Sequence, residues 1–179
     1  MDNSTADLLI FKTGQGDMAA FEQLYNELSK SVYAFALSIV KNPAAAEDIM
    51  QDTFVRIFNA ASGFRGGGKG IAWIMRIAHN LAISYVTAKT AEPEEKIDEE
   101  KSYNDTEASA SDKIDIDAAL GSLNEAERKI IILHAVSGLK LNEIAEILGE
   151  PLGTIKWRHS AALKKLKEKL SSEMEVNRQ

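Results

Sequence analysis

The sequence contains no cysteine and only three histidines and three prolines in 179 residues. The absence of cysteine excludes disulfides and zinc-thiolate sites. His79, His134 and His159 are not spaced to share one helix face, which argues against a metal site. No convergent acid or nucleophile accompanies them, and the glycine-rich GFRGGGKG lacks the ending of a phosphate-binding loop. We therefore predict no catalytic residue, no cofactor and no enzyme activity.

Long apolar runs are also missing. The longest aliphatic run is IIIL at 130–133, far short of the roughly 20 residues that span a bilayer. The N-terminal MDNSTADLLIFK lacks the basic start of a signal peptide. Apolar residues still make up 45% of the chain, which is enough for a packed core. We expect a cytoplasmic protein without membrane insertion.

Positive charge is in the minority, with a net charge of −6, but the imbalance is local. Residues 91–117 hold three Lys or Arg against eleven Asp or Glu, whereas residues 1–90 hold eight of each and residues 118–179 carry a net +2. Low hydrophobicity combined with charge of one sign predicts a flexible acidic linker, which we place at 91–114. The low isoelectric point therefore does not exclude nucleic-acid binding.

Helical periodicity dominates the N-terminal half. Asp17 is a good N-cap for a helix whose apolar residues recur in steps of three and four. The KNP sequence at 41–43 ends that helix and begins another. A glycine-rich loop at 62–70 precedes a helix over 71–87. Beyond the linker, we expect short helices near 115–121, 125–136, 141–148 and 151–170. The prediction is an all-α protein of two helical lobes, 1–90 and 115–179.

Residues 141–160 have the spacing of a helix-turn-helix. Ala145 lets two helices approach closely, Gly149 suits the positive φ of the turn, and Ile155 fills the angle between the helices. From 154 to 170 the chain holds six Lys or Arg and one Glu, a charge that suits DNA phosphates and the major groove. The alternative is an ordinary surface hairpin with a solvated lysine face. Outward residues of the second helix would include Thr154, Lys156, Trp157, Arg158 and His159.

Three segments, in this order, resemble the extracytoplasmic-function sigma factors of bacterial RNA polymerase. They are AEDIMQDTFVRIF (46–58), FRGGGKGIAWIMRIAHNLA (64–82) and LNEIAEILGEPLGTIKWR (141–158). The resemblance implies a region 2-like lobe, 1–90, for the core polymerase clamp and the minus-ten promoter element. It implies a region 4-like lobe, 115–179, for the minus-thirty-five element. The expected function is promoter-specific transcription initiation, with core RNA polymerase and promoter DNA as partners.

The resemblance also assigns site residues. Polymerase binding falls to Asp48, Gln51 and Asp52, which helical periodicity places opposite the apolar stripe; a solvated acidic face is the alternative. The minus-ten reader would comprise Phe64, Arg65, Lys69, Trp73, Arg76, His79 and Asn80, although the apolar neighbours of Trp73 favour a core position for it. The minus-thirty-five contacts would be Gly153, Thr154, Lys156 and Arg158, with Trp157 and His159 beside them. Arg158 would either read a guanine or hold a phosphate.

Three departures from the family pattern weaken the expected DNA contacts. The loop reads GGGKG, the segment SYVTAKT at 84–90 replaces a basic run, and Trp157, Ala161 and Leu163 replace polar or basic residues. A second hypothesis is therefore a helix-turn-helix regulator that no longer recruits polymerase. The family further implies an anti-sigma protein as a partner. The acidic linker would serve either as a mimic of nucleic acid inside polymerase or as a plain tether.

Overall fold

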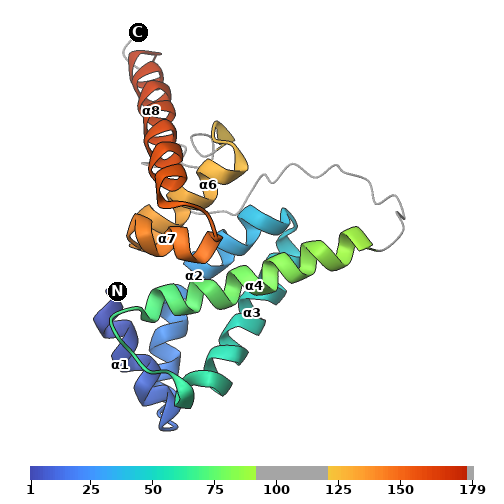
Figure 1. Ribbon diagram of the computed structural model, residues 1–179, viewed down its shortest axis with the longest axis vertical. Helices are drawn as coiled ribbons and strands as arrows, with labels where there is room; N and C mark the ends of the chain where they lie inside the picture. Colours follow the sequence, from blue (N-terminus) through green and yellow to red (C-terminus); the bar gives the residue numbers. More distant parts are fainter. Residues whose placement is uncertain (92–120, 177–179) are drawn as a thin grey trace.

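The computed structural model describes residues 1–91 and 121–176. The predicted linker at 91–114 and the helix expected near 115–121 lie almost entirely outside these residues. All regular elements within the two described stretches are helical, which confirms the all-α prediction (Figure 1). We call residues 1–91 the first lobe and residues 121–176 the second lobe.

The first lobe is a bundle in which α2 packs against the other long helices, and α4 lies across one side of the bundle (Figure 1). Its elements are α1 (Asn3–Gly14), α2 (Met18–Val40), α3 (Pro43–Ala60), the short 3-10 turn η1 (Ala61–Gly63) and α4 (Gly70–Ala91). The apolar steps of three and four bury one stripe of α2 and one of α3.

Local capping sets the helix boundaries of the first lobe. The Asp17 side chain accepts a hydrogen bond from the backbone N–H of Ala20 at 3.1 Å, as its N-cap position predicts. Lys41 has a left-handed backbone, with φ of 53°, that ends α2. The Asn42 side chain then caps α3 by accepting from the N–H of Ala45 at 2.9 Å.

The second lobe contains the predicted helix-turn-helix. Its elements are α6 (Glu125–Ile131), the π-helical turn η2 (Ile132–Val136), α7 (Leu141–Leu148) and α8 (Leu152–Val176). Gly149 ends α7 with a φ of 68°, and Ile155 is fully buried. The helix expected over 125–136 is α-helical only to Ile131 and ends in the wider turn η2. There the N–H of Ser137 donates to the carbonyl of Ile132, five residues earlier.

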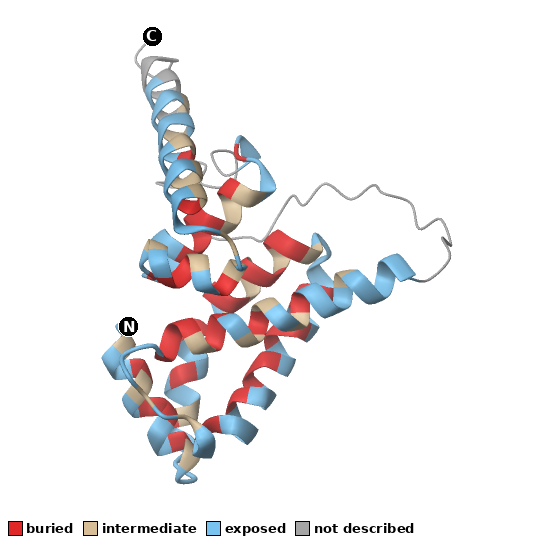
Figure 2. Cartoon of the chain, viewed as in Figure 1, coloured by how far each residue is buried: buried red, intermediate tan, exposed pale blue. Residues whose placement is uncertain are grey.

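The two lobes pack directly on one another. The first lobe's α2 contacts α6 and η2, and α4 contacts α7. The fully buried Leu133 and Ile144 of the second lobe belong to the same hydrophobic core as Val32 and Phe35 of α2. Figure 2 shows buried residues continuing across this boundary. One apolar core therefore holds together two lobes that the sequence pattern describes separately.

Candidate nucleic-acid interface

The three predicted polymerase-binding residues lie on the exposed side of α3. Asp48, Gln51 and Asp52 are all exposed, whereas the intervening Ile49 and Met50 are buried in the core. This alternation follows from the 3.6-residue period of the helix. It leaves two carboxylates and one amide available to a partner.

The predicted minus-ten reader begins in the loop between η1 and α4. Phe64 is half-buried, and its ring centroid lies 5.0 Å from that of Trp73, at an interplanar angle of 45°. Both side chains pack against the core, so Trp73 fits the core alternative more closely than a free stacking surface. Arg65 and Lys69 are exposed. The loop thus carries two cations beside a partly covered aromatic pair.

Two residues of α1 hold this loop, and neither of them belongs to a sequence motif. The Asp7 carboxylate accepts a hydrogen bond from the N–H of Gly68 at 2.6 Å. The Asn3 side-chain oxygen accepts from the N–H of Ile71 at 3.0 Å, at the start of α4. These partners lie 61 and 68 residues apart in the sequence, so no local pattern indicates them.

Along α4, the predicted readers divide by exposure. Arg76 and Asn80 are exposed, whereas His79 is half-buried, with its ring 6.2 Å from that of Phe35. Burial, and then the nearby Lys129 ammonium of α6, lower the pKa of His79, while a hydrogen bond with Asn80 partly opposes them. Packing beside Phe35 and the positive charge of Lys129 both favour the neutral form of His79.

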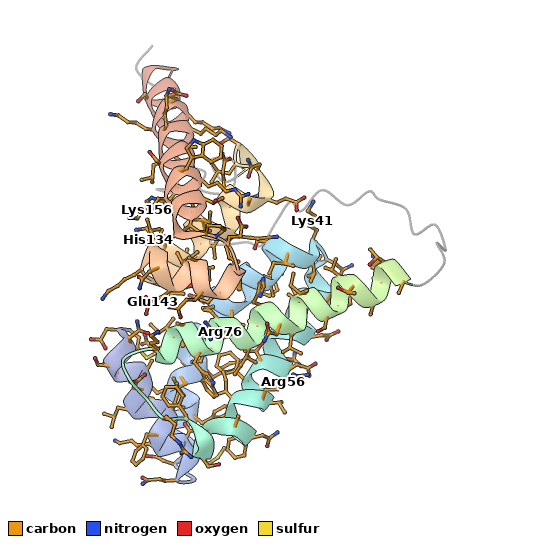
Figure 3. The ribbon with its side chains drawn as sticks, in the orientation of Figure 1. Lys41, Arg56, Arg76, His134, Glu143 and Lys156 are labelled. Carbon is orange, nitrogen blue, oxygen red and sulfur yellow. The ribbon has the colours of Figure 1, made fainter. Side chains whose placement is uncertain are left out.

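Glu146 of α7 contacts two of the predicted minus-ten readers. One carboxylate oxygen of Glu146 lies 3.4 Å from the Lys69 ammonium and 3.5 Å from the Arg76 guanidinium. Figure 3 shows Arg76 on the side of α4 that faces α7. Asn3 of α1 also reaches the second lobe, donating to Glu143 at 3.4 Å. The lobe predicted to read one DNA element thus contacts two cations predicted to read the other.

In the helix-turn-helix, the start of α8 is the most accessible part. Gly153 and Lys156 are exposed, and Trp157 is 70% exposed. Thr154 is half-buried. An exposed lysine beside an exposed indole offers a phosphate contact and a flat apolar surface to a DNA groove.

The other two predicted contacts of α8 are engaged within the second lobe. The guanidinium of Arg158 forms an ion pair with Glu150 in the turn between α7 and α8. The ring of His159 lies 4.7 Å from that of His134 in edge contact. Burial, and then His134, lower the pKa of His159. Both residues therefore contribute to the packing of the turn in this arrangement.

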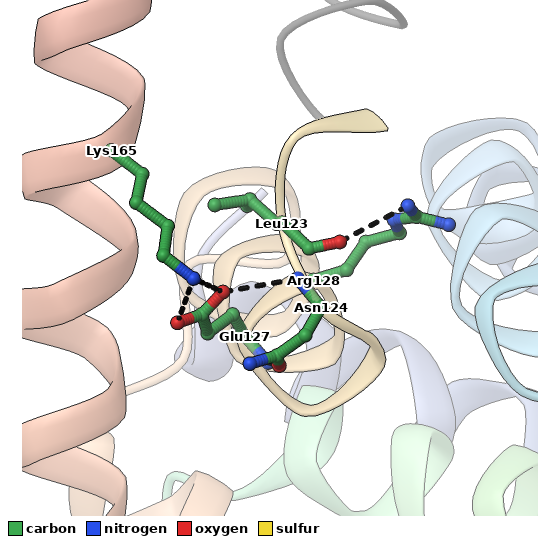
Figure 4. A network of polar contacts seen from close by, with 5 residues as sticks. All are labelled: Leu123, Asn124, Glu127, Arg128 and Lys165. Carbon is green, nitrogen blue, oxygen red and sulfur yellow. Dashed lines mark hydrogen bonds and ion pairs between the residues drawn. The ribbon is translucent and has the colours of Figure 1, made fainter.

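A buried carboxylate fixes α8 to α6. Glu127 forms a capping box with Asn124, and the Lys165 ammonium donates to both of its carboxylate oxygens at 2.8 Å (Figure 4). Burial alone would raise the pKa of Glu127, but Lys165 and the Asn124 N–H outweigh it and leave that pKa below its ordinary value. Lys165, one of the six Lys or Arg residues between 154 and 170, thus has a structural role.

Within the described stretches, no group of three or more metal-ligating side chains comes together. Among the helices of those stretches, none has the length and apolar character needed to cross a membrane.

Comparison with known proteins decides the family. The sigma-70 region 2 family model matches residues 24–92, and the sigma-70, region 4 model matches residues 119–168. The ECF RNA polymerase sigma factor SigE of Mycolicibacterium smegmatis is 28% identical over 183 residues, covering 95% of this chain and 69% of SigE. The RNA polymerase sigma factor CarQ of Myxococcus xanthus is 30% identical over 178 residues, covering 94% of this chain and 98% of CarQ. The chain belongs to the extracytoplasmic-function (ECF) sigma factors.

This ECF sigma factor directs RNA polymerase to promoters and, like its family, is not an enzyme. Region 2 falls mainly in the first lobe and region 4 in the second. A solved structure of the sigma factor RpoE with the anti-sigma factor NepR from Bartonella quintana is 29% identical, with a TM-score of 0.67. The match covers 84% of this chain and 96% of that one. The predicted family, fold class and lack of enzyme activity are confirmed.

Proposed function

We propose that this sigma factor binds core polymerase through Asp48, Gln51 and Asp52 and reads a promoter with both lobes. The observation that carries the proposal is the joint exposure of these three side chains on the face of α3 opposite its buried stripe. Carboxylates with unsatisfied acceptor capacity on a rigid helix suit a basic surface on a partner protein. We propose a region 2-like domain at 1–90 and a region 4-like domain at 115–179, joined by a linker at 91–114.

The first lobe would read the minus-ten element through the loop and the exposed side of α4. Phe64 and Trp73 would flank an extruded base, while Arg65, Lys69 and Arg76 would hold phosphates. His79 and Asn80 would supply hydrogen bonds to base edges. Partial burial of Phe64 and Trp73 supports a pocket wall more than an open stacking platform.

The second lobe would read the minus-thirty-five element through the first turns of α8. Exposed Gly153 permits close approach of backbone to DNA, and Lys156 and Trp157 project beside it. Thr154, Arg158 and His159 complete the proposed surface. Arg158 would first have to exchange its ion pair with Glu150 for a DNA contact.

The proposed function requires the lobes to separate. The minus-ten and minus-thirty-five elements are centred about 25 base pairs apart, as their names indicate. At 3.4 Å per base pair this separation is about 85 Å. In the packed arrangement, Lys69 of the minus-ten reader lies 3.4 Å from Glu146 of the helix-turn-helix. One molecule therefore cannot contact both elements without breaking this packing. The linker at 91–114 would keep the lobes connected.

We further propose that the protein acts in the cytoplasm and is regulated by an anti-sigma protein. The complex of the related RpoE with NepR supports such a partner. A protein that binds across both lobes would hold them in the packed arrangement, in which Glu146 forms ion pairs with Lys69 and Arg76.

A transcription assay with bacterial core polymerase and a promoter library tests the proposal. We expect initiation at a defined promoter class, and a loss of polymerase affinity of about tenfold or more when Asp48, Gln51 and Asp52 become alanine. The matched control replaces the exposed Glu22, Gln23 and Asn26 of α2 and should leave affinity unchanged. Failure of the unaltered chain to bind polymerase would contradict the proposal. DNA binding without initiation would favour a regulator that no longer recruits polymerase.

A further inference from the structure

The reader loop, residues 64–69, contains three consecutive glycines in unusual backbone conformations. Gly66, Gly67 and Gly68 have φ values of 71°, 97° and 71°. Glycine populates such conformations freely and loses much backbone entropy when it is fixed in one of them. The loop sequence therefore does not select a single shape by itself, and contacts from outside the loop must do so.

The carboxylate of Asp7 in α1 provides those contacts. The N–H of Gly68 donates to Oδ2 at 2.6 Å. A Cβ atom added at Gly66 would lie 3.3 Å from the same oxygen, and one added at Gly70 would lie 2.8 Å from Oδ1. The loop backbone thus passes close to the Asp7 side chain, and at Gly70 the distance leaves no room for a Cβ atom. The glycines of GGGKG, which departs from the family pattern, allow the loop backbone to lie against this carboxylate.

The same helix also contacts both ends of the loop segment. A Cβ atom added at Gly14 would lie 2.7 Å from the backbone carbon of Ala61, where η1 begins. At the other end, Asn3 accepts from the N–H of Ile71 at 3.0 Å. Since α1 is fixed at these two points, its carboxylate reaches the middle of the loop at a defined position.

We propose that Asp7 is a positioning residue for the minus-ten reader. Its carboxylate holds the reader loop in the shape that presents Phe64, Arg65 and Lys69 to an extruded base, and it makes no contact with DNA itself. The inference rests on the proposed function of the loop. It adds α1, which no part of the recognised motif includes, to the machinery that sets promoter specificity.

The test uses the full chain assembled with core polymerase and a promoter fork with unpaired minus-ten bases, taken from the promoter class found by transcription. Fork affinity, discrimination against a fork with substituted minus-ten bases, and affinity for core polymerase are measured. Asp7→Ala should weaken fork binding about tenfold or more and reduce discrimination. Asp7→Asn should restore most of both, because its side-chain oxygen still accepts from Gly68. Polymerase affinity should not change.

Asp2→Ala is the matched control. Asp2 accepts from the N–H of Thr5 at 2.7 Å and caps the same helix, so this variant loosens α1 through a different hydrogen bond. It should retain discrimination. A second pair separates close packing from general damage. Gly14→Ala should reduce discrimination because its Cβ displaces η1, whereas Gly63→Ala, with no atom within 4 Å of the added Cβ, should not.

The outcomes are distinguishable. If Asp7→Ala retains the discrimination of Asp2→Ala, or if Asp7→Asn loses as much as Asp7→Ala, the positioning role of the Asp7 hydrogen bond is overturned while the proposed function stands. If the unaltered holoenzyme does not discriminate between the two forks, both proposals are overturned, because there is then no minus-ten reader to position.

Discussion

Reversing the charge of Glu146 should open the packed arrangement of the lobes. Its carboxylate lies 3.4 Å from the Lys69 ammonium and 3.5 Å from the Arg76 guanidinium. The Glu146 side chain is 50% exposed, and those of Lys69 and Arg76 are 56% and 49% exposed. Each pair therefore stabilises the packing by only about 0.2–1 kcal/mol.

Glu146→Lys replaces both attractions by repulsions of similar size. The packed state should lose about 1–4 kcal/mol relative to the separated state. This shifts the equilibrium by a factor between about five and several hundred at low salt. Salt should reduce the effect, because the screening length falls from about 10 Å at 0.1 M to about 3 Å at 1 M.

The absence of cysteine makes a fluorescence assay direct. Cysteines introduced at the exposed Asn26 of α2 and Ser160 of α8 accept a donor and an acceptor dye without competing thiols. Energy transfer should decrease in Glu146→Lys at low salt and recover partly at 1 M salt. Glu22→Lys changes the net charge equally at an exposed site on α2 and should not affect transfer. Unchanged energy transfer in Glu146→Lys, with the fold intact by circular dichroism, would contradict this prediction.

Three further predictions concern the shared core, the second lobe and pH. Leu133→Ala, at a fully buried position of the common core, should lower the free energy of unfolding by about 2–5 kcal/mol in urea titrations; a change below 1 kcal/mol would contradict that core role. Glu127→Ala should destabilise the second lobe by about 1–3 kcal/mol, through loss of its cap and of the Lys165 contact; Lys165→Met, measured by the same unfolding titration, should also be destabilising. Acidification should loosen the lobes. The pKa of His79 is lowered in the packed state, so the stabilisation is complete above its ordinary value of 6.5 and is lost as pH falls from 6.5 through the lowered pKa. In the same fluorescence assay, energy transfer should fall on acidification below pH 6.5 in the unaltered protein, and this fall should be absent in His79→Gln.

Local sequence signals were sufficient for the helices and for the exposed faces. Asp17 and Asn124 cap the helices that follow them, and Gly149 adopts the left-handed turn that its place after α7 predicts. The exposure of Asp48 follows from the helical period alone. These features depend on residues within four or five positions of one another, so a single sequence contains all the information they require.

The sequence motifs gave no indication of what contacts the predicted readers. Asp7 meets Gly68, and Glu146 meets Lys69, across 61 and 77 residues. Neither acidic residue belongs to a motif, and isolated charges on helices are normally solvated. Such contacts depend on how whole helices pack, which local periodicity does not specify.

The two helical lobes and the helix-turn-helix could be predicted from the sequence, because capping, periodicity and turn residues act over short separations. The family followed from the resemblance of three segments. Three features required the tertiary structure: the single apolar core of the two lobes, the ion pairs of Glu146 with Lys69 and Arg76, and the hydrogen bond from the Gly68 N–H to Asp7. The physical reason is that burial of apolar surface brings distant segments together regardless of their order in the chain. The polar contacts formed there are consequences of that packing.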